Sequence, residues 1–220
     1  MLRELFIGKA PSHFRMDEGV KALIISDTFL WSAWHFVTHI FAIFAVNEIS
    51  GGSVGIAASA YSVHLIARVF SELASGRYLS GVTRQRRLKE FVIVVAGLLL
   101  LSVAYIGFAT AQTVVVLFAG YIASGIGFGI SAPARQTFFS LHLDKNKEEA
   151  EWGLRDAAVF GGMALSAALG GFVAQQYGFR VLFILSAIIN FLSLIPYFLY
   201  FKRERRTVLS RIEETVIHAT

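Results

Sequence analysis

Apolar residues dominate six long windows of the chain, and polar residues collect between them. These windows cover 22–46, 53–75, 89–111, 113–139, 155–176 and 178–201. Each approaches or exceeds the roughly 20 residues that a helix needs to cross the hydrocarbon core of a membrane. Runs such as FVIVVAGLLLLSVAYIGFA (91–109) lack the alternation of barrel strands, and helices satisfy their own backbone in lipid. The pattern predicts an all-α membrane protein with six transmembrane helices.

The same pattern divides the chain into three parts. Residues 1–21 form an N-terminal segment at the membrane interface or in the cytoplasm, 22–201 form the bundle, and 202–220 form a basic cytoplasmic tail. The N-terminal segment does not resemble a secretory signal, because the apolar window after it is long and no cleavage site follows a short one. The tail is either an interfacial amphipathic helix or a frayed basic end.

Composition supports a membrane location. Hydrophobic residues make up 55% of the chain and charged residues only 16%, which is too apolar for an ordinary soluble domain. The chain contains no cysteine, which excludes disulfides and thiolate metal sites. The partner expected from composition is therefore the lipid bilayer.

Basic residues mark one side of the membrane. They gather before the first window, after the second and after the sixth, whereas the connections 47–52, 110–113 and 175–180 carry few charges. The positive-inside rule then predicts a multi-pass protein of a prokaryotic inner membrane with both termini in the cytoplasm. Because topology accounts for the arginines, we expect no nucleic-acid partner.

Two glycine-containing motifs and one aromatic motif resemble those of a known family. Gly76 and Arg84 in GRYLSGVTRQRR (76–87) fall in register with Gly-x-x-x-Asp-Arg-x-Gly-Arg-Arg, a gating loop, although Ser80 replaces its aspartate. The fifth window and its approach keep the spacings of Gly-x8-Gly-x3-Gly-Pro-x2-Gly-Gly, and YGFRVLF (177–183) is similar to Gly-Trp-Arg-x-x-Phe. The glycines that keep these spacings are Gly153, Gly162, Gly170 and Gly171.

These motifs resemble the amino-terminal six-helix half of the major facilitator superfamily of transporters. The resemblance implies a 3+3 inverted repeat and alternating access between two such halves. It also implies that the chain acts as a half-transporter, completed by a homodimer or a second half with the second and fifth helices at the seam. Tyr121 stands where many members carry a proton-coupling arginine. The glycines are expected to form a flat face for helix packing.

Two ladders of polar residues lie in the first two windows. Asp27, Trp31, His35 and His39 are four residues apart, so they share one broad helix face. Ionisable side chains inside a membrane usually face a cavity or a partner, so this face is expected to point inward. The second window carries His64, Arg68 and Glu72 with the same spacing.

Several interpretations of the two ladders stay open. The ladder residues line a substrate or proton route, since histidine changes charge between pH 5 and 8, or they form fixed structural contacts. Arg68 has three possible partners, which are Glu72 in its own helix, Asp27 in the first helix, or a facing half. His35 and His39, with His64 as a third ligand, also raise the possibility of a metal.

Arg135, near the inner end of the fourth window, is a candidate contact for an anionic substrate group or a snorkelling interfacial cation. Charged residues around 144–156 either solvate a loop or form an inner gate. No enzyme constellation and no cofactor motif is recognisable.

The sequence therefore predicts secondary transport of a small solute. The alternatives are a non-transporting membrane scaffold, one half of a split transporter, or an intramembrane metal enzyme. Cations, amphiphiles and organic acids all remain possible solutes.

Overall fold

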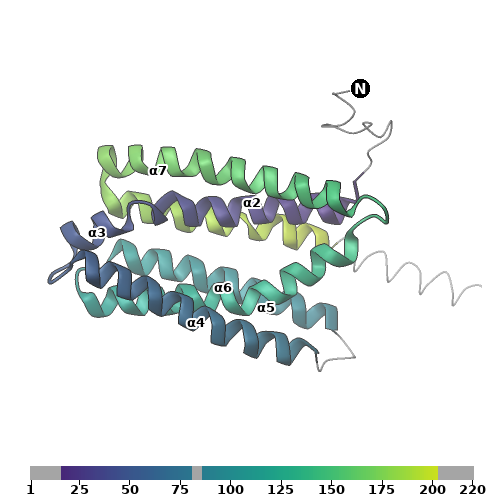
Figure 1. Cartoon of the computed structure of the whole chain (residues 1–220), viewed down its shortest axis with the longest axis horizontal. Coiled ribbons are helices and arrows are strands. Elements are labelled where there is room, and N and C mark those ends of the chain that lie inside the picture. Colours follow the sequence, from purple (N-terminus) through teal and green to yellow (C-terminus); the bar gives the residue numbers. More distant parts are fainter. Residues whose placement is uncertain (1–15, 81–85, 203–220) are drawn as a thin grey trace, which may run out of the picture.

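The computed structural model describes residues 16–80 and 86–202. Nearly all of them are helical, and the helices run beside one another along the long axis of the molecule (Figure 1). The helices are α2 (Glu18–Thr38), α3 (Phe41–Glu48), α4 (Val54–Ser80), α5 (Arg86–Ala109), α6 (Val114–His142) and α7 (Glu148–Leu192).

Four of these helical stretches are long and apolar enough to cross a membrane, and the pair α2 and α3 adds a fifth if it forms one bent span. The axis bends by 45° between α2 and α3, whereas the sequence predicts one continuous helix over 22–46. The bend follows a tightened turn, in which the Ile40 N–H donates to the Val37 carbonyl at 3.2 Å.

The long helix α7 contains a break at Gly178. Its backbone there has φ 80° and ψ 168°, a conformation that glycine adopts without steric cost. The ribbon reverses direction at this break, and the second leg runs back toward the other end of the bundle (Figure 1). Gly178 is the first residue of the sixth predicted window. By length and apolarity, however, α7 and its continuation to Lys202 count as a single stretch of 55 residues.

Glycines bring α6 close to its two neighbours. A Cβ atom added at Gly129 would lie 2.6 Å from the carbonyl oxygen of Arg68 in α4. A Cβ at Gly127 would lie 2.7 Å from the carbonyl oxygen of Gly97 in α5. Small residues of this kind allow membrane helices to approach backbone to backbone, and here they place α6 between α4 and α5.

The predicted flat glycine face of α7 is divided. Gly162 and Gly170 pack against α2, where a Cβ at Gly162 would lie 2.7 Å from the Ser32 hydroxyl oxygen. Nothing lies within 4 Å of a Cβ at Gly153 or Gly171. The helix period explains the difference, because the nine residues from Gly153 to Gly162 correspond to about 180° of rotation.

A buried asparagine ties the second leg of α7 to α5. The side-chain nitrogen of Asn190 donates to the Leu98 carbonyl at 2.7 Å and to the Ser102 hydroxyl at 2.8 Å. Aromatic rings pack around the start of α3, where the centroids of the Phe41 and Tyr121 rings lie 4.6 Å apart. The predicted pathway residue Tyr121 thus lies at the edge of an aromatic core.

The close approach of α4 and α6 yields a stability prediction. Gly129→Ala should force the two helices apart at a cost of about 1–3 kcal/mol, whereas Gly107→Ala, which has open space around it, should not. Thermal unfolding in detergent micelles checks this, with a melting temperature several degrees lower only for Gly129→Ala. Equal melting temperatures for both variants would refute the packing described for α6.

Candidate functional site

A buried carboxylate joins three helices toward one end of the bundle. Asp27 of α2 is only 5% exposed. Arg135 of α6 donates from Nη1 to its Oδ1 at 2.8 Å. Arg155 of α7 donates to its Oδ2 from Nε at 2.9 Å and from Nη2 at 2.6 Å. Both carboxylate oxygens are therefore engaged, and we call Asp27, Arg135 and Arg155 the ion cluster.

Further groups complete the surroundings of the ion cluster. Arg155 also contacts Asp156 at 3.1 Å, so two guanidinium groups face two carboxylates. The Arg155 guanidinium lies 5.4 Å from the Trp152 ring centroid, within the range of a cation–π contact. Within the described residues, the Nε atom of Arg135 and the hydroxyl of Tyr197 are buried without a hydrogen-bond partner.

In this conformation the Arg135 and Asp27 side chains are engaged with each other. Arg135 is 6% exposed, and its contact with an anionic substrate group stays a prediction. Arg155, which sequence reasoning assigns to a charged loop, is the second partner of Asp27. The two residues lie 128 positions apart, and no sequence pattern signals a pairing that depends on how α2 packs against α7.

The second ladder lies on α4, facing α2 and α6. Arg68 pairs with Glu72, with 3.5 Å between Nε and Oε2, which selects one of the three partners open from the sequence. The Arg68 guanidinium also lies 5.3 Å from the Phe128 ring and 5.9 Å from the Trp31 ring. Asp27 is occupied by the two other arginines.

The histidines divide into two groups. His35 and His39 lie with Nδ1 and Nε2 3.2 Å apart, and their exposure rises along the helix from half-buried His35 to exposed His39. His64 is separate and 2% exposed. In the described residues, no group of three or more histidine, aspartate or glutamate side chains is placed to hold a metal ion.

His64 is fixed in place by neighbouring side chains. Its Nδ1 lies 2.7 Å from the Ser124 hydroxyl oxygen, and that hydroxyl donates to the Tyr121 carbonyl at 2.9 Å. The Ser124 oxygen is therefore left to accept a hydrogen bond from His64. The imidazole stacks on the Trp34 ring with 4.7 Å between centroids and 19° between planes.

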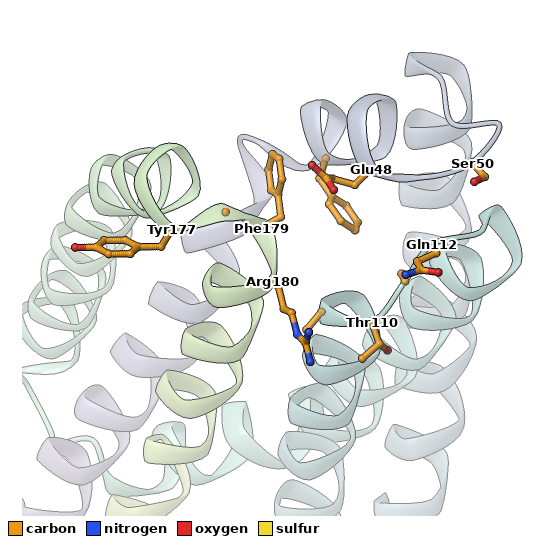
Figure 2. A pocket seen from close by; sticks show the side chains of 11 residues that line it. Glu48, Ser50, Thr110, Gln112, Tyr177, Phe179 and Arg180 are labelled. Carbon is orange, nitrogen blue, oxygen red and sulfur yellow. The ribbon is translucent and has the colours of Figure 1, made fainter.

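The surface also carries two open depressions, and sequence reasoning identifies neither. The larger, of about 620 Å³, lies where α3 meets the α5–α6 connection and the break in α7. Figure 2 shows its polar and aromatic side chains, with Arg180 extending toward Thr110. A smaller depression of about 340 Å³ lies between α2, α3, α4 and α6.

The predicted gating-loop residues are only partly described. Gly76 lies within the last turns of α4, with nothing within 4 Å of an added Cβ. Arg84 lies outside the described residues. The role assigned to this loop by resemblance therefore stays a prediction.

A bundle of helices long and apolar enough to cross a membrane, with an ion cluster buried among three of them, is the architecture of a multi-pass membrane protein. The family model described as Major Facilitator Superfamily matches residues 22–217. The chain belongs to the Major Facilitator Superfamily, which confirms the resemblance of its motifs. It is an integral, multi-pass membrane protein, and the family supports membrane transport in general.

Curated relatives include two staphylococcal proteins named proton-coupled antiporter flippase LtaA. The chain is 26% identical over 117 residues to the one from Staphylococcus epidermidis strain RP62A, covering 53% of this chain and 30% of that protein. It is 21% identical over 171 residues to the one from Staphylococcus haemolyticus, covering 77% and 40%. The chain thus spans less than half the length of these relatives.

A solved structure shares the fold. The POT family transporter PepTSo superposes with a TM-score of 0.73 at 15% sequence identity. The match covers 86% of this chain and 38% of PepTSo. The likeness supports a Major Facilitator fold for the helices described above.

Removing the Asp27 carboxylate tests how much the ion cluster contributes to the stability of the fold. Asp27→Asn leaves the buried Arg135 without a counter-charge, while Arg155 keeps its contact with Asp156. Breaking a buried pair in this way costs about 3–5 kcal/mol. Asp156→Asn, whose side chain is 51% exposed, should change stability little. Thermal unfolding in micelles should show a large drop in melting temperature for Asp27→Asn alone. A parent-like melting temperature for Asp27→Asn would contradict the described cluster.

Proposed function

We propose that the chain forms a six-helix half of a secondary transporter that moves a small solute by alternating access. A second six-helix unit faces it, either another copy of this chain or a different half. The observation that carries this proposal is the incomplete burial of ionisable groups. Arg68 and Glu72 side chains are 27% and 36% exposed, and His39, which follows the last residue of α2, is exposed as well.

Lipid is a poor environment for these groups. A charged side chain at the bilayer centre costs several kcal/mol, so such residues face a cavity or a partner. A facing unit would enclose the Arg68 and Glu72 side chains in a water-filled cavity. A polar face inside an otherwise apolar surface therefore favours a transporter half over an isolated bundle.

The chain offers six crossings for this arrangement. The bent pair α2 and α3 supplies the first, α4, α5 and α6 supply the next three, and the two legs of α7 supply the last two. Such a set permits the 3+3 inverted repeat and places both termini on the cytoplasmic side, in agreement with the charge pattern.

The outer surfaces of α4 and the first leg of α7 are suited to the seam between the halves. In α4, Phe70 and Leu73 are 69% and 61% exposed, and in α7, Phe160 and Leu165 are 61% and 63% exposed. In the homodimeric form of the proposal, α4 of one copy packs beside the first leg of α7 of the other.

The relatives support a proton as the coupling ion, because their name describes a proton-coupled antiporter. Tyr121 replaces the arginine linked to proton coupling in other members, so the proton would need another carrier. His35 and His39 are adjacent titratable groups on the open face, and histidine protonates within the physiological range. We assign the proton route to this pair.

A non-transporting scaffold and the isolated half of a split transporter are the competing functions. A scaffold would co-purify with a stoichiometric protein partner and show no solute-dependent stabilisation. A split half would be inert until it is combined with its other half. A chain that stays strictly monomeric in lipid nanodiscs contradicts the homodimeric form of the proposal.

Uptake into proteoliposomes tests the proposal directly. Radiolabelled organic acids, organic cations and amphiphiles are each offered under an imposed proton gradient. At least one class should accumulate above the level of protein-free liposomes. His35→Ala should lower its initial rate by roughly tenfold, the equivalent of about 1.4 kcal/mol, because the proton route loses one of its two groups.

Val115→Ala is the matched control. Val115 lies in the first turn of α6 and is 78% exposed, so this variant should transport at the parent rate. An unchanged rate and proton dependence in His35→Ala would remove the histidine pair from the mechanism. Failure of all three solute classes, with the purified chain dimeric and stable, would refute the transport function.

A further inference from the structure

The smaller depression is lined by aromatic rings from four helices. It lies between α2, α3, α4 and α6 and has a volume of about 340 Å³. Its larger side chains are those of Trp34, Thr38, Phe41, Tyr61 and Tyr121, and the remainder of its wall is alanine and valine. We call it the aromatic pocket. A pocket with this lining is suited to a flat apolar group rather than to a strongly hydrated one.

The rings beside the pocket are already arranged as a stack. The imidazole of His64 lies nearly parallel to the Tyr61 ring, with 8° between planes and 5.8 Å between centroids. It also stacks on Trp34, and the Ser124 hydroxyl holds it in place. The walls are therefore preorganised, which reduces the entropy lost when a ligand binds.

A cation lies one helical turn beyond His64. Arg68 makes no hydrogen bond to any group in the part of the chain that the structure describes, and its contact with Glu72 is long at 3.5 Å. Its guanidinium is held against the rings of Trp31 and Phe128, and its side chain is 27% exposed. The five N–H donors of a guanidinium form a fork that matches a carboxylate.

The spacing of these features defines the shape of a ligand. Tyr61 and Arg68 are seven residues apart on α4, which corresponds to about 10.5 Å along the helix. We propose that this site binds an aromatic carboxylate, with its ring in the aromatic pocket and its carboxylate on Arg68. The inference rests on the proposed transport function and names the solute class that the same face would carry.

Charge order along α4 favours an anion over a cation. From the pocket, a ligand meets Arg68 before Glu72, because Glu72 lies one turn farther from Tyr61. A cationic group extending from the ring would therefore approach the guanidinium first. A neutral aromatic ligand would leave the donors of Arg68 unused.

Equilibrium dialysis of the full chain in lipid nanodiscs tests this assignment. The probes are radiolabelled 4-phenylbutanoate, its amide and hexanoate, and empty nanodiscs correct for partition into lipid. The acid should bind at least about tenfold more tightly than the amide, the order expected for a hydrogen bond to a charged group. The acid should also bind more tightly than hexanoate, which lacks the ring.

Variants separate the two halves of the site. Arg68→Gln should reduce binding of the acid to the level of the amide, and Tyr61→Ala should weaken both ligands equally. Arg77→Gln, an exposed arginine on the same helix, should bind like the parent. Should Arg68→Gln prove unstable, Arg68→Lys keeps the charge without the fork and should give intermediate binding of the acid.

Equal binding of acid and amide by the parent chain would overturn the proposal. So would an unchanged preference for the acid in Arg68→Gln, or equal binding of hexanoate and 4-phenylbutanoate. Binding is measured without transport, so the two proposals fail separately. Selective binding without uptake into proteoliposomes would contradict the transport function and leave the aromatic carboxylate site in place.

Discussion

Hydrocarbon does not solvate charge, and this constraint organises the structure. Asp27 meets it by accepting hydrogen bonds on both oxygens from Arg135 and Arg155. Because these residues come from α2, α6 and α7, neutralising one charge fixes three helices relative to one another. Buried ion pairs seldom add net stability over apolar packing, yet removing one member is costly. The ion cluster therefore holds the bundle in this arrangement, and a transporter that changes access would have to loosen or carry it as a unit.

The ionisable residues of α4 and at the end of α2 are not buried in this way. In the part of the chain that the structure describes, Arg68, Glu72 and His39 stay partly or fully exposed. In the proposed function, a second unit and the water between the two units would enclose them. The aromatic pocket and the guanidinium of Arg68 lie along the same helix, α4, and the proposed ligand would contact both. Binding energy from both contacts can then favour one access state over the other.

Local patterns predicted much of the fold. Apolar windows correspond to the helices, and Gly178 lies at the predicted boundary between the last two windows, because these features depend on neighbouring residues. The helix period also predicts that Gly153 and Gly162 lie on opposite faces of α7, although the family motif suggests one common packing face. Tertiary pairings were not predictable. Arg155 joins Asp27 across 128 residues, and the aromatic pocket collects side chains from four helices that share no sequence pattern.

We infer that the ionisable face of α2 and α4 points away from lipid. Because the chain has no cysteine, a spin label introduced through His39→Cys can report its surroundings in nanodiscs by collision with oxygen or with a water-soluble nickel complex. The account predicts strong collision with nickel at this position, and collision with oxygen for a label at Val103→Cys, an exposed apolar site on α5. Oxygen-dominated collision at His39→Cys, equal to that at Val103→Cys, would contradict it.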